Sequence, residues 1–408
     1  MSHKNAVILL FLIAVGVALG GLCGWFFGES MLKVAWIGEL FLNLLKMVIV
    51  PLIVSAVISG VVTMGSKGNF ERIGGLTILY YMCTTGIAVF IGLVMVNIIR
   101  PGEGLNITAG EQLAANIAAK QDTGFSDIIL SMVSPNLVKS AVENQLLPII
   151  LFSIVFAIAL NMLGERGRPV AAFFESVNEA MMKIVTWIMY LAPIGIFALI
   201  AGRLGQAGGG AAFFNEIKAV GWHVVTVLSG LAIHFLALFA ILYFVTGRGW
   251  SYFTGMLRAL LTAFGTASSS ATLPLTMECA RENRIDERAS RFVLPLGSTV
   301  NMDGTALYEA AAVMFIAQSY GLEMGFSLQV IIFITATLAA IGAAGIPEAG
   351  LVTMVIVLQA VGLPLEGIAL LLSVDWFLDR FRTSINVWGD SVGAAVIHKF
   401  LQKEPTGV

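Results

Sequence analysis

Charged and polar side chains recur at helical spacing between Asp375 and Asp390, a segment that reads DWFLDRFRTSINVWGD inside a long apolar stretch. On a helix, one face spanning about 80° and rising over about 22 Å holds five of them: Asp375, Asp379, Arg382, Asn386 and Asp390. One charge at the centre of a bilayer costs roughly 2.5–3.5 kcal/mol, so the segment's charges together would cost about 15 kcal/mol in lipid. We therefore expect a polar column that faces the protein interior.

Arg382 and Asp379 lie one turn apart in this column and differ in charge. The guanidinium of Arg382 offers a planar fork that binds a carboxylate through two hydrogen bonds. The carboxylate of Asp379 accepts hydrogen bonds from an ammonium group. Together they suit a zwitterion that carries an extra carboxylate. The alternative is an internal Asp–Arg salt bridge that only fixes helix packing.

Two further polar segments interrupt apolar runs. Ser268, Ser269 and Ser270 supply hydroxyls and free backbone N–H groups, and a helix N-terminus there would favour an anion. A serine linker is the alternative. The segment 301–305, NMDGT, allows unwinding, which frees carbonyl oxygens beside the Asp303 carboxylate. Sodium prefers such oxygen ligands, and unwound carbonyls supply them in transporters.

Four more polar side chains have a chemical and a structural interpretation. Tyr81, Thr84 and Thr85 place oxygens on one face of a helix, although such groups often serve packing alone. Glu309 stands two turns after Asp303 in an apolar run, so it is a candidate proton carrier. A neutral, hydrogen-bonded structural glutamate is the alternative.

The composition is that of a polytopic helical membrane protein, which we expect to be one integrated domain over residues 1–408. The chain has 408 residues, of which 58% are hydrophobic and 12% charged, and apolar stretches of spanning length recur throughout. The net charge is −2 without a basic run, so no nucleic-acid partner is expected. The cysteines Cys23, Cys83 and Cys279 lie far apart, which argues against a disulfide or a metal site.

Eight transmembrane helices and two re-entrant helical hairpins are predicted. Six ordinary spans are expected at about 6–28, 35–64, 75–99, 143–163, 175–202 and 218–246. The first is a span rather than a signal peptide, because its apolar run continues without a cleavage site. Later apolar runs break at 265–274 (GTASSSATLP) and 342–350 (GAAGIPEAG). Half-length pieces cannot span, and a broken backbone at membrane depth needs protein or water around it, so each pair is a hairpin.

The distribution of Lys and Arg predicts the orientation. If the spans alternate, one side collects most of the basic residues: Lys4, Lys67, Arg72, Arg166, Arg168, Arg248, Arg281, Arg284, Arg288, Arg291, Lys399 and Lys403. Both termini are then cytoplasmic, in a multi-pass protein of the cell membrane. The two hairpins enter from opposite sides, which makes them an inverted repeat.

The chain resembles the glutamate/aspartate transporter family, the dicarboxylate/amino acid:cation symporters. The resemblance rests on four motifs in order: SSSATLPLT (268–276), NMDGTALYEA (301–310), GAAGIPEAGLVT (342–353) and DWFLDRFRTSINVWGDS (375–391). It implies a homotrimer with an elevator mechanism. The scaffold would comprise about 1–74 and 143–204, and the mobile transport part about 75–99 and 218–402. The outer hairpin, around Ile346 and Gly350, would act as a gate.

Residue roles carry over from the family at matching positions. Arg382 would hold the substrate's side-chain carboxylate and Asp379 its amine. The rest of the substrate shell would comprise Ser269, Ser270, Thr305, Thr383 and Asn386. One sodium would bind Asp390 with carbonyls of Gly297, Asn301 and Asn386, and a deeper one would bind Tyr81, Thr84, Thr85, Asn301 and Asp303. A third would lie between Thr299 and hairpin carbonyls near Ile341 and Ala343.

Three positions place the chain near the animal excitatory transporters within the family. Ala267 stands where archaeal members carry an arginine, and Arg380 on the last helix balances the charge instead. Glu309 also matches the animal branch, where this position carries a proton. The resemblance thus implies uptake of acidic amino acids with sodium and protons, and potassium counter-transport. A C4-dicarboxylate symporter and an anion-conducting channel on the same fold are the alternatives, and an enzyme is not expected.

Overall fold

The computed structural model describes residues 3–65, 71–105, 130, 132–143, 145–206, 211–342 and 349–402. Its elements are helices, and these ranges contain no strand, which confirms the predicted all-helical class. Five predicted spans correspond to described helices: α1 (His3–Phe27), α2 (Ala35–Gly65), α3 (Glu71–Ile99), α7 (Leu146–Met162) and α10 (Ala211–Ile241). The short elements η1 (Gly28–Val34), α6 (Leu137–Val142), η3 (Gly164–Arg166) and the π turn η4 (Leu242–Thr246) lie between or after them.

The predicted span at 175–202 corresponds to two helices rather than one. Helix α8 (Arg168–Met189) and helix α9 (Ala192–Gln206) meet there at a bend of 54°. Pro193 explains the break, because proline cannot donate the interior helical hydrogen bond but fits the first turn of a new helix. Among the described residues, three helical stretches are long and apolar enough to cross a membrane, Phe11–Val48, Gly74–Ile99 and Phe214–Thr246, and the bent pair would be a fourth. The count of eight therefore stays a prediction.

The broken segments after Gly247 form paired helices. Helices α11 (Trp250–Thr266) and α12 (Ser269–Glu282) are separated only by Ala267 and Ser268, a narrower break than 265–274. Ala267 has a left-handed φ of 49°, and the Ser268 side chain caps α12 by accepting from the Ala271 N–H at 3.2 Å. One left-handed residue and one cap thus suffice to reverse the chain.

The other breaks lie close to their predicted positions. Helix α13 (Glu287–Val300) stops at Asn301, and α14 (Asp303–Ser319) starts two residues later. Helices α15 (Phe326–Gly342) and α16 (Ala349–Val361) form the second pair, and the residues 343–348 between them lie outside the described ranges. After the short η5 (Leu365–Gly367), helix α17 (Ile368–Gln402) closes the described chain.

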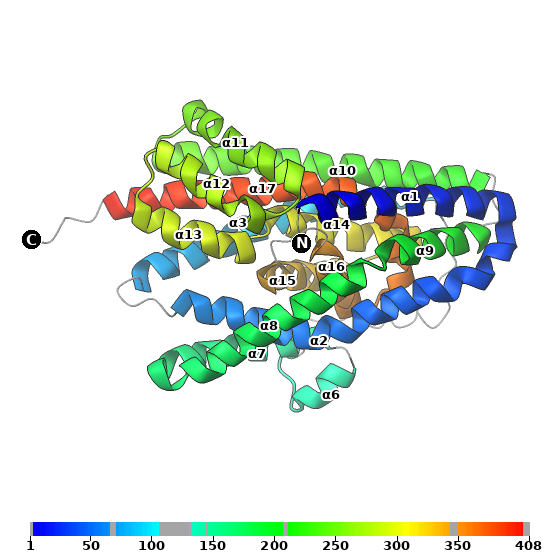
Figure 1. Ribbon diagram of the computed structural model, residues 1–408, viewed down its shortest axis with the longest axis horizontal. Helices are drawn as coiled ribbons and strands as arrows, with labels where there is room; N and C mark the ends of the chain where they lie inside the picture. Colours follow the sequence, from blue (N-terminus) through cyan, green and yellow to red (C-terminus); the bar gives the residue numbers. More distant parts are fainter. Residues whose placement is uncertain are drawn as a thin grey trace, which may run out of the picture.

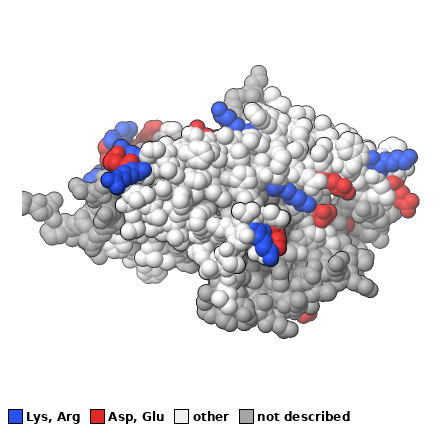
Figure 2. Space-filling view, turned by 90° about the horizontal axis from the view of Figure 1, so that it is seen from below, with Lys and Arg blue, Asp and Glu red and all other residues white. Residues whose placement is uncertain are grey.

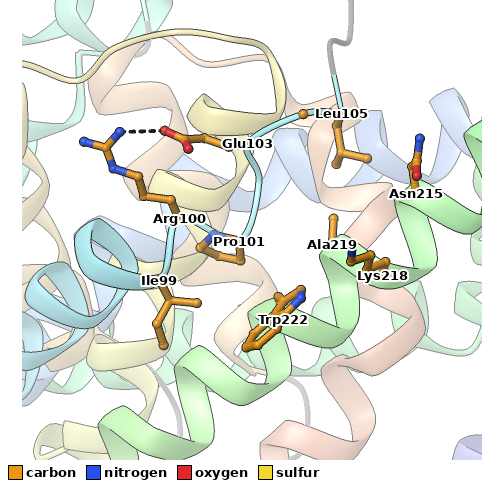
Figure 3. A pocket seen from close by; sticks show the side chains of 10 residues that line it. Ile99, Arg100, Pro101, Glu103, Leu105, Asn215, Lys218, Ala219 and Trp222 are labelled. Carbon is orange, nitrogen blue, oxygen red and sulfur yellow. Dashed lines mark hydrogen bonds and ion pairs between the residues drawn. The ribbon is translucent and has the colours of Figure 1, made fainter.

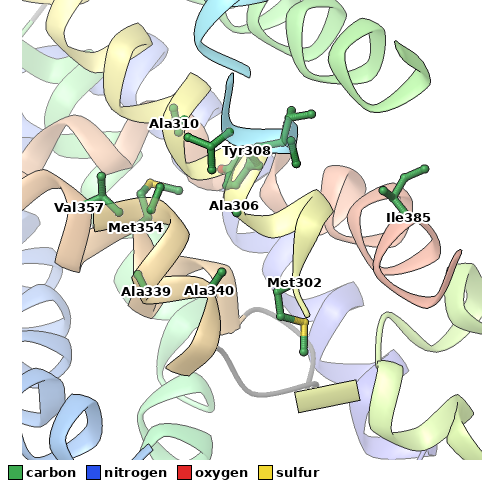
Figure 4. Close-up of a cluster of buried hydrophobic side chains, with 14 of the residues drawn as sticks. Met302, Ala306, Tyr308, Ala310, Ala339, Ala340, Met354, Val357 and Ile385 are labelled. Atoms are coloured by element: carbon green, nitrogen blue, oxygen red, sulfur yellow. The ribbon is translucent and has the colours of Figure 1, made fainter. Parts of the chain in front are cut away.

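Helix α14 is the centre of the packing and is nearly all buried. It contacts α3, α10, α15, α16 and α17, which surround it in the middle of the molecule (Figure 1). Small side chains make this close approach feasible. Ala306 and Ala310 of α14 lie near Ala339 and Ala340 of α15, with Met354 of α16 beside them (Figure 4). The core therefore holds α14 in a fixed place among its neighbours.

The helices pack as two groups. Helices α1, α2, α7, α8 and α9 contact one another, while α3 and α10–α17 form the group around α14. The two meet chiefly where α2 touches α15 and where α9 touches α17, and also where α2 touches α3, α13 and α16, α7 touches α16, and α1 touches α17. On the face in Figure 2, charged side chains gather in separate clusters between wide uncharged areas. The uncharged areas of that surface suit contact with hydrocarbon.

Candidate functional site

Arg382 is fully buried on α17 and forms two internal ion pairs. Its Nη1 lies 2.9 Å from Asp375 Oδ1, and its Nη2 donates to Asp379 Oδ1 at 2.9 Å. The Tyr308 ring of α14 lies under the guanidinium, with its centroid 4.0 Å from Cζ. The internal Asp–Arg salt bridge, which was the alternative to a substrate site, is thus present, and it includes Asp375, for which the sequence suggested no role. Buried charges need such pairing, because an unpaired one costs several kcal/mol.

The five-residue face of α17 is buried along its length, as its periodicity predicts. Arg380 lies off this face and donates through Nη1 to the carbonyls of Phe264 and Gly265, at 3.1 and 2.9 Å. These carbonyls belong to the last turn of α11, which has no helical partners for them. Arg380 therefore fixes the tip of the first hairpin against α17, next to Asp379 in sequence.

Several predicted substrate residues meet around Arg382. Asn386 Oδ1 accepts from the Gly304 N–H at 2.7 Å, and its Nδ2 donates to Thr305 Oγ1 at 3.3 Å. At Gly350 an added Cβ would lie 3.1 Å from Arg382 Nη1 and 3.4 Å from Thr305 Cγ2. The N-terminus of α16 thus approaches the guanidinium closely, which a larger side chain at position 350 would oppose.

The remaining predicted substrate residues are less closely tied to Arg382. Thr383 is buried on α17. Ser269 is buried at the start of α12, and its Oγ has no hydrogen-bond partner among the described residues, whereas Ser270 is exposed. Ile346 lies outside the described residues. The structure therefore brings Asn386, Thr305 and Gly350 together at the guanidinium and leaves the Ser269 hydroxyl available.

A second cluster consists of buried oxygen atoms from α3 and the α13–α14 break. Thr85 Oγ1 donates to Asp303 Oδ1 at 2.8 Å, and Thr84 Oγ1 lies 3.4 Å from the same oxygen. Both hydroxyls also lie 3.4–3.5 Å from Asn301 Oδ1. The side chains are almost fully buried. Carboxylate, amide and hydroxyl oxygens are hard ligands, so this set fits sodium as a transported ion.

Asn301 joins this cluster to the other predicted sodium residue, Asp390. Its Nδ2 donates to Asp390 Oδ1 at 3.0 Å. An added Cβ on Gly297 would collide with Asp390 Oδ1 and with the Tyr81 hydroxyl, so the glycine lets both groups come close. The Tyr81 hydroxyl itself donates to the Val293 carbonyl at 2.7 Å. Asn301 thus bonds directly to Asp390, and the Thr84 and Thr85 hydroxyls connect it to Asp303.

The third predicted sodium site is only partly described. The Thr299 side chain is exposed and donates to the Leu296 carbonyl at 3.0 Å. The Ile341 carbonyl and the Val300 side chain lie near the same point beside Gly60, so α13 and α15 do approach each other there. Ala343 lies outside the described residues. This region therefore adds no ligand cluster to the two above.

Glu309 is fully buried on α14 and is hydrogen-bonded to the second hairpin. The Thr353 hydroxyl of α16 donates to Glu309 Oε1, and Oε2 has no hydrogen-bond partner among the described residues. A carboxyl group in this position can gain or lose a proton while it contacts α16. The sequence predicts that the hairpin containing this helix acts as a gate.

Comparison with known proteins identifies the family of this chain. The model of the sodium:dicarboxylate symporter family matches residues 9–400. The chain belongs to the sodium:dicarboxylate symporter family. It is 40% identical to excitatory amino acid transporter 1 of Ambystoma tigrinum, over 90% of this chain and 77% of that one. It is 38% identical to excitatory amino acid transporter 3 of rabbit, Oryctolagus cuniculus, over 98% of this chain and 86% of that one. As a family member the chain is a membrane transporter, not an enzyme.

The comparisons confirm the resemblance found in the motifs, and family membership supports sodium as the coupled ion. In this symporter the oxygen cluster and the surroundings of Arg382 involve the same two helices, α14 and α17. Asn386 of α17 contacts Gly304 and Thr305 of α14, and Asp303, the residue before Gly304, bonds to Thr85.

His234 of α10 is a member of the site that the sequence analysis missed. Its Nε2 lies 3.1 Å from Asp303 Oδ2, and its side chain is buried. Asp303 is thus held from two sides, by Thr85 and by His234. An ionisable residue inside an apolar span was the available signal. The signal was not used, because His234 lies outside the recognised motifs and is 69 residues from its partner.

Proposed function

We propose that this symporter takes up glutamate or aspartate across the cell membrane, coupled to sodium and protons, with potassium counter-transport. The observation that carries the proposal is the fully buried Arg382 between Asp375 and Asp379. A fixed guanidinium can bind the carboxylate of a substrate, and Asp379 beside it can bind an ammonium group. Glutamate and aspartate carry both groups. The names of the relatives, excitatory amino acid transporters, support this substrate class.

In this proposal Asp375 and Asp379 hold Arg382 ready when no substrate is bound. The substrate's side-chain carboxylate takes the fork of Arg382, and its amine takes Asp379. Thr305, Thr383, Asn386 and Ser269 complete the shell. Desolvation of three charged groups is then offset by their mutual pairing and by the substrate's own charges. A neutral amino acid has no side-chain carboxylate to bind the guanidinium of Arg382.

Sodium would bind at the oxygen cluster next to the substrate. Asp303 and Asp390 are the charged ligands, and Thr84, Thr85 and Asn301 supply neutral oxygens. Cation charge would stabilise the two buried carboxylates, and Asn386 connects that region to the substrate shell. Each positive charge that moves inward gains about 2.3 kcal/mol per 100 mV of membrane potential. Several coupled ions can therefore drive uptake against a steep gradient.

Glu309 would carry the proton. Its contact with Thr353 links its protonation to α16, so a proton could favour the closed hairpin. The two packed groups of helices would act as scaffold and transport part, with α1, α2 and α7–α9 in the scaffold. The transport part would move across the membrane within a homotrimer, and both termini would be cytoplasmic.

The experiment is uptake of labelled aspartate and glutamate into proteoliposomes, with sodium, proton and potassium gradients imposed separately. We expect uptake only with inward sodium, faster uptake with an inward proton gradient, and further acceleration by internal potassium. An uptake of succinate at the same rate would favour the C4-dicarboxylate alternative. A substrate-independent, non-saturating anion current without uptake would favour the channel. Either result would contradict the proposal.

A further inference from the structure

A polar pocket outside the site described above lies between the end of α3 and the start of α10. It has a volume of about 410 Å³. The Arg100–Glu103 pair lies on one wall and Asn215 and Lys218 of α10 on the other, with Pro101 and Trp222 between them (Figure 3). Polar side chains of both walls and the ring of Trp222 thus face the same pocket.

The charges of this pocket suit a ligand that carries both signs. Arg100 Nη1 pairs with Glu103 Oε1 at 2.7 Å, which largely neutralises those two groups. Among the described residues no carboxylate pairs with Lys218, so its ammonium is available to an anion. Glu103 keeps a second carboxylate oxygen that can accept from a cation. A phosphate at Lys218 and a primary ammonium at Glu103 would satisfy both walls.

The pocket stands at the boundary of the apolar layer. The membrane-length stretch of α3 ends at Ile99, so Arg100, Pro101 and Glu103 lie just beyond it. That of α10 begins at Phe214, so Asn215, Lys218 and Trp222 lie in its first turns. Further along α3, away from the pocket, Ile98 is 71% exposed and Phe90 60% exposed. Trp222 is typical of the interface between hydrocarbon and headgroups. A ligand in this position meets polar groups at one end and exposed apolar side chains at the other.

We propose that this pocket binds the headgroup of a phospholipid that carries a primary ammonium, such as phosphatidylethanolamine. The phosphate lies at Lys218 and Asn215, the ammonium at Glu103, and the acyl chains run along the exposed side chains of α3 and α10. The lipid then bridges two helices of the group packed around α14. Phosphatidylcholine cannot donate a hydrogen bond to Glu103, and phosphatidylglycerol carries no cation, so both bind more weakly.

Native mass spectrometry of the purified full-length protein tests this site, with the three phospholipids added at matched acyl chains. We expect phosphatidylethanolamine to bind most tightly. Lys218→Gln should weaken it about fivefold, as expected for one basic residue near a lipid surface. Glu103→Gln should weaken it too, but should strengthen phosphatidylglycerol binding, since Arg100 is then unpaired. This reversal of preference is the most specific result.

Matched controls are Lys33→Gln and Glu366→Gln, which alter exposed residues outside the pocket and should leave all three affinities unchanged. Equal affinities for the three lipids in the native protein, or the same loss in Lys33→Gln as in Lys218→Gln, would overturn the proposal. So would glycerophosphoethanolamine, the headgroup without chains, binding as tightly as the lipid, because the ligand would then be a soluble zwitterion. The readout is binding, so it does not depend on the proposed transport function.

Discussion

Two regions of this protein contain ion pairs between an arginine and a carboxylate, and the pairs differ in burial. On α17, Arg382 and its partners Asp375 and Asp379 are buried. On α13, which follows the first hairpin, Arg291 pairs with Glu287 at 2.9 Å, with 71% and 61% of these side chains exposed. The distance between the arginine nitrogen and the carboxylate oxygen is 2.9 Å in both regions, whereas the burial of the side chains differs. Buried pairs are costly to break, whereas exposed pairs contribute little, so only the first region can serve recognition.

The largest expected effect is that of Arg382→Ala. Removal of one partner from a buried ion pair costs about 3–5 kcal/mol, so affinity for aspartate should fall at least about a hundredfold. Sodium-driven uptake of labelled aspartate measures this loss, and uptake of labelled serine tests for a gain of neutral substrates. Arg291→Ala is the matched control. An equal effect of the two arginine variants would remove the distinction between the regions.

The next effect concerns the buried carboxylate of the oxygen cluster. Asp303→Asn removes the charge that Thr85 and His234 hold in place, so the sodium concentration for half-maximal uptake should rise about tenfold or more. A sodium titration of uptake measures it. Asp286→Asn, in the turn before α13, is the control and should leave sodium dependence unchanged. If Asp303→Asn behaves like this control, the cluster does not bind the coupled ion.

Glu309→Gln should have a smaller and more selective effect. Glutamine can still accept from Thr353 but cannot exchange a proton, so uptake should become independent of pH while sodium dependence remains. Uptake measured across external pH values, in parallel with proton flux by a pH-sensitive dye, checks this. Persistent proton flux in the variant would leave Glu309 with a structural role only.

The smallest effect is expected in the exposed region. Arg291→Gln breaks an i,i+4 pair on α13, which is worth about 0.5 kcal/mol or less. Thermal unfolding and aspartate uptake should both remain close to those of the native protein. A large loss of uptake in this variant would show that this exposed ion pair of α13 contributes to function despite its exposure.

The polar face of α17 could be predicted because helical periodicity depends on the local sequence alone. Which carboxylates touch Arg382 could not be predicted in the same way, and Asp375 and Asp379 both do. Spacing places all three side chains on one face, but side-chain conformation decides the pairing. The bend between α8 and α9 was missed because the apolar run continues across Pro193.

Contacts between distant segments were predictable only where a motif existed. The serine run 268–270 and the NMDGT break marked where helices end, and Asn301 and Asp303 lie in the expected cluster. His234 carries no motif around it, and its contact with Asp303 depends on how α10 packs against α14. The polar pocket at Lys218 likewise forms only when α3 and α10 come together.

The central claim is that Arg382 and Asp379 together select a substrate with an amine and an extra carboxylate. Equilibrium binding of aspartate, succinate and serine to the purified protein in sodium tests it most directly, because succinate lacks the amine and serine lacks the second carboxylate. We predict that aspartate binds at least about tenfold more tightly than either, as expected for the loss of one charged hydrogen bond. Equal binding of succinate and aspartate would contradict the role of Asp379, and equal binding of serine would contradict that of Arg382.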